Sequence, residues 1–169
     1  MTRCPLVFTR PGIFFYREIL HLSMTIREAT LQDAAAVAVL FDAYRIHYEQ
    51  APDLPGAEAF IADRIRNRES VIYLAEEGEE LLGFVQLYPL FTSVGMQRAW
   101  VLNDLYVWEQ YRNTGVGRAL IDAAKALAQS TNAKWIMLQT HNDNVNAQAL
   151  YEKTGFEKDD IYYYYYLSV

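Results

Sequence analysis

The feature that most constrains the fold is a strand that runs through a glycine-containing turn into a long helix. Residues 97–107 are interpreted as a strand, and the Ala- and Leu-rich residues 115–130 follow a helical pattern. The turn reads Arg112-Asn113-Thr114-Gly115-Val116-Gly117. This order places unpaired backbone N–H groups at a helix N-terminus, where an anion can sit. The segment therefore predicts either a phosphate site or an ordinary strand-to-helix turn.

Two familiar phosphate-binding patterns do not match this turn. No Lys-Ser/Thr pair follows it, as a Walker loop requires. Its glycines, Gly115 and Gly117, lie too close to Arg112 for the dinucleotide-binding fingerprint. The pattern thus excludes these two classes of nucleotide site.

The rest of the chain predicts a mixed α/β domain in the order β-α-α-β-β-β-α-β-α-β. Pro52 and Pro55-Gly56 are expected to end the first helix, and the acidic residues 76–80 to form a hairpin turn. The other expected helices cover residues 31–50, 57–67 and 144–153, and the other expected strands cover residues 24–29, 71–75, 81–88, 135–140 and 162–167. This order alone leaves many functions open.

Length, charge and cysteine content narrow the class of protein. The 169 residues fit a single domain that needs neither a disulfide nor a metal to support its core. No apolar run reaches the length of a membrane span, and the net charge of −6 disfavours nucleic acid as a partner. Cys4 is the only cysteine, which excludes an internal disulfide and a Cys-rich metal site and favours a cytoplasmic setting.

The first 23 residues differ from the remainder of the sequence. They contain Arg3, Arg10 and Arg17 against Glu18 alone, and Pro11-Gly12 interrupts the apolar stretch that a signal peptide would need. An alternating strand pattern begins at Met24. We therefore interpret residues 1–23 as a dispensable N-terminal extension and residues 24–169 as the domain.

Two motifs resemble those of the GCN5-related N-acetyltransferase family. The turn at residues 112–117 is similar to the family pattern Gln/Arg-x-x-Gly-x-Gly/Ala. Residues 144–156 read NVNAQALYEKTGF and resemble its second pattern, Asn-x-x-Ala-x-x-Leu-Tyr-x-Lys-x-Gly-Phe. The resemblance covers about residues 24–169. It implies a mostly antiparallel central sheet flanked by helices, and an enzyme that transfers acetyl from acetyl-CoA to an amine without a metal.

The resemblance also implies which residues bind the cofactor. The pyrophosphate would lie on the backbone amides of the glycine turn, where the missing Cβ atoms allow close approach. Strand-edge groups before the turn would meet the pantetheine arm and the thioester. The implied cofactor-binding residues are Leu105, Tyr106, Val107, Arg112, Asn113, Thr114, Gly115, Val116, Gly117, Arg118 and Asn144.

Two residues of the second motif have alternative roles. Asn144 matches the position that hydrogen-bonds the pantetheine arm, and it would equally serve as a helix N-cap. Tyr151 matches the proposed general acid that protonates the departing CoA thiolate, and an aromatic residue here would otherwise pack in the core.

The base that deprotonates the amine is less well marked. The segment at residues 102–107 resembles the Leu-Glu-Asp segment of diamine acetyltransferases, but Asn103 replaces the Glu and cannot accept a proton. Asp104 is our first choice, as cation anchor or water-mediated base, with His141 next and His47 as a further candidate.

Two rival functions remain open at this stage. A non-catalytic acyl-CoA sensor is favoured by the loss of the Glu at position 103, and a purely structural protein by the tyrosine run at residues 162–166. We expect that run to alternate across a sheet and to bury one face in the core or in a homodimer. The expected acceptor is a small amine, an amino acid or a lysine side chain.

Overall fold

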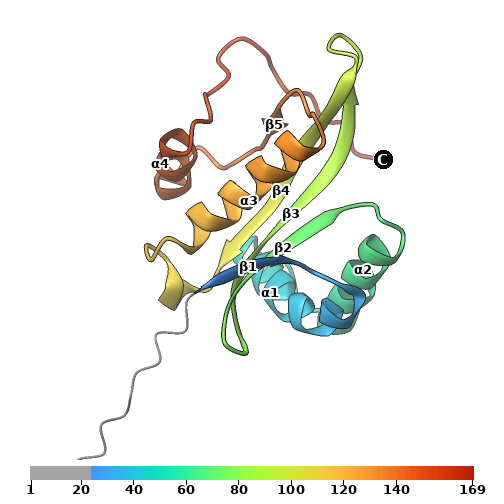
Figure 1. Cartoon of the computed structure of the whole chain (residues 1–169), viewed down its shortest axis with the longest axis vertical. Coiled ribbons are helices and arrows are strands. Elements are labelled where there is room, and N and C mark those ends of the chain that lie inside the picture. The colour runs from blue at the N-terminus through green and yellow to red at the C-terminus, as the bar shows by residue number, and fades with distance from the viewer. Residues whose placement is uncertain (1–23) are drawn as a thin grey trace, which may run out of the picture.

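The computed structural model describes residues 24–169, and the expectation for residues 1–23 lies outside them. A five-stranded sheet in the order β1-β2-β3-β4-β5 forms the centre of the molecule (Figure 1). Its first four strands are antiparallel and β5 runs parallel to β4. The mixed α/β class and the mostly antiparallel sheet are therefore confirmed. The strands are β1 Thr25–Glu28, β2 Val71–Glu77, β3 Glu80–Thr92, β4 Gln97–Val107 and β5 Ile136–Met137.

Helices cover both faces of this sheet. Helices α1 (Ala34–His47) and α2 (Leu54–Arg66) pack on one face, through a cluster that includes Leu40, Ile61 and Phe84. Helix α3 (Val116–Ser130) packs on the other face, and α4 (Val145–Lys153) lies beside it (Figure 1). Two short 3-10 helices, Leu31–Asp33 and Glu109–Tyr111, precede α1 and α3. Among the described helices, none combines the length and the apolarity that crossing a bilayer would require.

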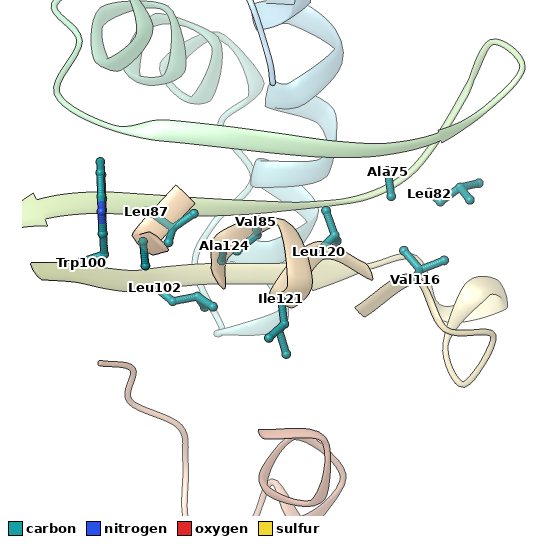
Figure 2. Packing of buried hydrophobic residues seen from close by; sticks show 11 residues of the cluster. Ala75, Leu82, Val85, Leu87, Trp100, Leu102, Val116, Leu120, Ile121 and Ala124 are labelled. Atoms are coloured by element: carbon teal, nitrogen blue, oxygen red, sulfur yellow. The ribbon is translucent and has the colours of Figure 1, made fainter. Parts of the chain in front are cut away.

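The α3 face holds the larger core. Leu120, Ile121 and Ala124 recur at helical spacing and are buried against Val85 and Leu87 of β3 (Figure 2). The burial of several such side chains, each contributing roughly 1.5–3 kcal/mol, fixes α3 on the sheet. The N-terminus of α3 is thereby held at the end of β4, where the glycine turn lies.

Helix α2 begins earlier than the sequence pattern indicated. Asp53 caps it, accepting a hydrogen bond from the Gly56 N–H at 3.0 Å. Pro55 stands in the first turn, where a helix needs no N–H donor. The prediction that Pro55-Gly56 lies before the helix was therefore wrong, and the first helix already ends at His47.

The predicted final strand at residues 162–167 is also wrong. No strand follows α4 in the described chain, and the aromatic side chains of the run are exposed, from 53% at Tyr164 to 91% at Tyr165. High strand propensity alone does not form a strand, because backbone pairing needs a partner. The neighbouring edge strand β5 has only two residues, fewer than the predicted 135–140. The Tyr166 hydroxyl donates to Gln139 Oε1 at 2.8 Å, and the Tyr162 N–H donates to Asp159 Oδ1 at 3.2 Å.

A β-bulge in β4 determines which face of the sheet each of its last side chains points to. Gln86 pairs with Asp104 and Leu87 with Leu102, so Asn103 is an extra residue without a cross-strand partner. The bulge shifts the alternation by one residue. Leu102 and Leu105 thus both contact the α3 core, whereas Asp104 and Tyr106 point to the face covered by α1.

Candidate active site

A cleft of about 620 Å³ opens where β4, α3, α4 and α1 meet. Its volume lies within the range of small-molecule sites. Strand β4 contributes its last residues, α3 its N-terminus, α4 its inner face, and α1 its C-terminal turn. Its lining residues include Tyr44, His47, Tyr48, Asn103, Leu105, Tyr106, Val107, Arg112, Asn113, Gly115, Gly117, Arg118, His141, Asp143, Asn144, Leu150 and Tyr151.

The glycine turn forms one end of the cleft in a strained backbone conformation. Asn113 and Gly115 have φ angles of 63° and 98°, in the left-handed region. A Cβ at position 115 would meet no atom within 4 Å, so the space above this residue is open. Glycine is needed here because an L side chain strains such a backbone by roughly 1–2 kcal/mol.

Gly115 is the N-cap of α3, and the next three amides begin that helix. The N–H groups of Val116, Gly117 and Arg118 have no acceptor within an α-helix, because the fourth residue back is not helical. The positive end of the helix dipole adds roughly 0.3–1 kcal/mol for an anion at this point. The turn can therefore hold a phosphate group by its backbone.

Side chains around the turn fix its shape. Thr114 Oγ1 donates to the Tyr111 carbonyl at 2.7 Å, and Arg112 Nε donates to the Val107 carbonyl at 3.2 Å. The Thr114 side chain does not line the cleft, and Val116 is buried in the α3 core. These two residues can contribute backbone groups only, as the resemblance implied for the turn.

Gly117 has a packing role that the sequence did not reveal. A Cβ there would lie 3.1 Å from Leu150 Cδ2, across the floor of the cleft. The missing side chain thus lets α3 and α4 approach each other closely, in addition to leaving its amide accessible.

Helix α4 brings Asn144 and Tyr151 to the opposite wall. Asn144 is the N-cap, and its Oδ1 accepts from the Ala147 N–H at 3.2 Å. The expected capping role is therefore present, and the bond leaves the Asn144 amide nitrogen for a second partner. Gly155, with φ 91°, ends the helix as the sequence indicated.

The Tyr151 phenol is half-buried in the cleft. Its ring packs edge-on against Phe156 at 5.8 Å between centroids. Burial, with a smaller contribution from Tyr48, raises the Tyr151 pKa to about 12. The phenol is thus protonated at neutral pH and can donate a proton or a hydrogen bond.

Asp104 is not in the cleft wall. The residue is 4% exposed and lies behind two residues that do line the cleft, Asn103 and Tyr44. Asn103 Nδ2 donates to Asp104 Oδ1 at 3.1 Å. Burial raises the Asp104 pKa to about 6, and the hydrogen bonds from Asn103 and Tyr44 limit that rise.

Helix α1 supplies an aromatic wall that sequence reasoning largely missed. Tyr44, His47 and Tyr48 line the cleft on consecutive turns of its C-terminal end. The spacing of these three residues can be seen in the sequence, but residues of a helix that pack in the core have the same spacing. The ring centroids of Tyr44 and Tyr106 are 6.3 Å apart. Burial raises the pKa of Tyr44 above its ordinary value, and the neighbouring Tyr48 and Tyr151 add to this rise. Tyrosines from α1 and α4 therefore converge beside Asn103.

The two histidine candidates differ in their surroundings. His47 packs edge-on against Tyr48 at 5.4 Å between ring centroids. His141 is 68% exposed in its side chain, and its Nδ1 accepts from the Asp143 N–H at 3.3 Å. Both line the cleft, but within the described residues neither forms a hydrogen bond with Asp104.

No described group of three or more His, Cys, Asp or Glu side chains is arranged to hold a metal ion. The polar groups that line the cleft include the turn amides, the phenols of Tyr44, Tyr48 and Tyr151, the two histidines and Asn103.

Comparison with known proteins identifies this arrangement. The family model described as "Acetyltransferase (GNAT) family" matches residues 36–156, which include the turn, the bulge and α4. The chain belongs to this acetyltransferase family. It is an acyltransferase by that membership, and the family uses acetyl-CoA as co-substrate.

Similar proteins extend over nearly the same length. The N-acetyltransferase YhfO of Bacillus subtilis (strain 168) is 50% identical over 146 residues, which are 86% of this chain and 98% of the relative. The aminoglycoside N(6')-acetyltransferase type 1 of Stenotrophomonas maltophilia is 28% identical, over 83% of this chain and 91% of the relative. A crystal structure of a probable acetyltransferase superposes with a TM-score of 0.81 at 41% identity, covering 86% of this chain and 97% of that one.

Proposed function

We propose that the protein transfers an acetyl group from acetyl-CoA directly to a primary amine in the cleft. The observation that carries this proposal is that the α3 turn amides and the Tyr151 phenol line one cleft together with the last residues of β4. Transfer from a thioester that carries phosphate groups requires an anion site for the phosphates and a proton donor for the departing thiolate.

The cofactor residues act mainly through the backbone. The turn from Arg112 to Arg118 would hold the pyrophosphate, and the open space above Gly115 fits that role. Leu105, Tyr106 and Val107 would offer strand-edge groups to the pantetheine amides and the thioester carbonyl. The Asn144 amide nitrogen would donate to the same arm.

Tyr151 is the proposed acid. As the amine nitrogen attacks the thioester carbon and the carbon–sulfur bond breaks, the phenol gives its proton to the CoA sulfur. A proton leaving the nitrogen then restores the phenol. A covalent cysteine step is not invoked, because Cys4 lies outside the residues that match the family model.

The acceptor half of the cleft is aromatic and carries little negative charge. Its α1 wall consists of Tyr44, His47 and Tyr48, and the one carboxylate among the lining residues is Asp143, beside His141. A polycation such as an aminoglycoside, on which the Stenotrophomonas relative acts by its name, would find few counter-charges here. We therefore propose a small monoamine, an amino acid or a lysine side chain as acceptor.

We also propose a cellular location and an oligomeric state for the enzyme. A single cysteine, Cys4, favours a cytoplasmic enzyme. The exposed run Tyr162–Tyr166 would be covered in a homodimer, and light scattering on the purified protein measures whether one forms.

The experiment that tests the function has two stages. Calorimetry with acetyl-CoA measures binding, and a free-thiol assay with a panel of amines then measures turnover. Binding with thiol release supports the enzyme. Binding without thiol release for any amine would favour the second candidate, a non-catalytic acyl-CoA sensor, which the replacement at Asn103 favours. The absence of binding would refute both.

A further inference from the structure

The glycine turn is a strained segment whose two sides are held by different parts of the molecule. On its helical side, α3 is fixed on the sheet by buried residues such as Leu120 and Ile121. Between β4 and α3, the backbone of Asn113 and Gly115 lies in the left-handed region. Such a conformation persists only where its surroundings determine it. The contacts on the strand side of the turn therefore matter for its shape.

Tyr111 is the residue through which the strand side is held. Its N–H donates to the Trp108 carbonyl at 2.9 Å, and its carbonyl accepts from Thr114 Oγ1 at 2.7 Å. Its ring packs against the α3 core. Tyr111 does not line the cleft. Its effect on a bound ligand can therefore pass only through the turn.

Glu80 fixes the side chain of Tyr111 from a neighbouring element. The Tyr111 hydroxyl donates to Glu80 Oε1 at 2.6 Å, a distance typical of a hydrogen bond to a carboxylate. Glu80 is the first residue of β3, and the β2–β3 hairpin lies at the same end of the sheet as the turn (Figure 1). The hydrogen bond to Glu80 raises the pKa of the Tyr111 phenol, which stays a donor at neutral pH. This bond thus ties the hairpin to the turn.

A carboxylate at position 80 is unfavourable in other respects. Glu80 pairs across the hairpin with Glu77, and like charges directly opposite each other are destabilising. The carboxylate also places negative charge near a turn that is proposed to bind an anion. Among the described residues, Tyr111 is the one side chain that hydrogen-bonds to Glu80. This bond is therefore the advantage that a carboxylate offers here.

We propose that Glu80 and Tyr111 form a latch that orders the glycine turn before the pyrophosphate of acetyl-CoA binds. The inference rests on the proposed function, because it needs acetyl-CoA on the turn. Both are positioning residues, since Glu80 holds Tyr111 and the Tyr111 carbonyl holds Thr114, the residue before Gly115. A turn that is already ordered loses less conformational entropy on binding, so its affinity for the ligand is higher.

Calorimetry with acetyl-CoA tests the latch without an amine substrate. Glu80→Ala removes the acceptor, and Tyr111→Phe keeps the ring but removes the donor. We expect each variant to bind acetyl-CoA about three- to tenfold more weakly, the range expected when one hydrogen bond to a charged group is lost. The double variant should bind no more weakly than either single one, because both changes break the same bond. With an amine from the panel, KM for acetyl-CoA should rise by the same factor while kcat stays unchanged.

Two control variants separate the hydrogen bond from the charge of the hairpin. Glu79→Ala removes a neighbouring exposed carboxylate and should change the affinity by less than about twofold. Glu80→Gln removes the charge but keeps an oxygen that can accept from Tyr111, and it should bind acetyl-CoA more tightly than Glu80→Ala. The melting temperature of Glu80→Ala should stay close to that of wild type, because the loss of the bond is offset by the loss of repulsion from Glu77.

A control ligand separates an effect on the turn from general damage to the cleft. S-acetylpantetheine carries the thioester but no pyrophosphate, so it makes no use of the turn. With this donor, we expect kcat/KM of Glu80→Ala and Tyr111→Phe to equal that of wild type. An equal loss with both donors would overturn the latch, because the damage would then reach the thioester end of the cleft.

Other outcomes also overturn the latch while leaving the proposed function intact. One is wild-type affinity for acetyl-CoA in Glu80→Ala or in Tyr111→Phe. Another is a gain in affinity in Glu80→Ala, which would show that the charge of Glu80 outweighs its hydrogen bond. A loss in Glu80→Gln as large as in Glu80→Ala would exclude the hydrogen bond as the cause. Failure of the wild-type protein to bind acetyl-CoA would instead refute the proposed function itself.

Discussion

The buried carboxyl of Asp104 should cost the protein stability at neutral pH, and the cost can be calculated. Its pKa of about 6 in the folded protein compares with an ordinary value of 3.8. A difference of roughly two pKa units corresponds to about 3 kcal/mol, since one unit is about 1.4 kcal/mol. The residue is 4% exposed, so solvent screening does not reduce this figure greatly.

The sign of the effect follows from the two pKa values. Below pH 3.8 the carboxyl is protonated in both states and contributes no difference. Between 3.8 and about 6 the unfolded chain loses the proton first, so stability falls as pH rises, and above 6 the penalty is constant. Asp104→Asn removes the penalty but weakens the bonds from Asn103 and Tyr44, at a cost of about 1 kcal/mol. We therefore expect a net gain of about 2 kcal/mol at neutral pH.

Urea unfolding at about pH 4 and about pH 8 measures this difference. Asp104→Asn should be as stable as wild type or slightly less stable at the lower pH, because the penalty is small there, and should reach its full advantage of about 2 kcal/mol at the higher one. Glu58→Gln, which removes an exposed carboxyl on α2, is the control and should show no such trend. A stability difference that does not change with pH would refute the argument that Asp104 is buried with a raised pKa.

Other predictions concern the turn, the acid and the extension. Gly115→Ala should lower the free energy of unfolding by roughly 1–2 kcal/mol and weaken acetyl-CoA binding, because φ at 115 is 98°; thermal unfolding and calorimetry check this, and unchanged values would refute the role of the turn. Gly117→Val should weaken binding and also lower the melting temperature, because its side chain would meet Leu150; a variant as stable as wild type would contradict the packing role. Tyr151→Phe should keep acetyl-CoA affinity and lose about 10²-fold in turnover, and wild-type turnover would return Tyr151 to a packing role. Removing residues 1–23 should leave folding and cofactor affinity unchanged, and an insoluble truncated protein would contradict this.

The sequence predicted the parts of the site that depend on local chemistry. The glycine turn before α3 and the two ends of α4 can be recognised in the sequence. Few other residue types fit the backbone and capping positions of Gly115, Asn144 and Gly155. The hairpin at Gly78 is visible for the same reason.

Features that depend on pairing or on tertiary packing could not be read in this way. The bulge at Asn103 turns Asp104 away from the cleft, and a single extra residue in a ladder leaves no mark in the strand pattern. Tyr44 and Tyr48 have the spacing of core residues, and only the fold shows that they line a cleft. The strand expected at the tyrosine run lacks a partner, which propensity does not report.

The most direct test of the proposed acetyl transfer is mass spectrometry of an amine panel incubated with the protein and acetyl-CoA carrying an isotopically labelled acetyl group. We expect labelled acetyl on the nitrogen of a primary monoamine, amino acid or lysine side chain, with one free CoA thiol for each product, and a much slower reaction in Tyr151→Phe. Binding of acetyl-CoA without any labelled amide, or label appearing equally fast with Tyr151→Phe, would contradict it.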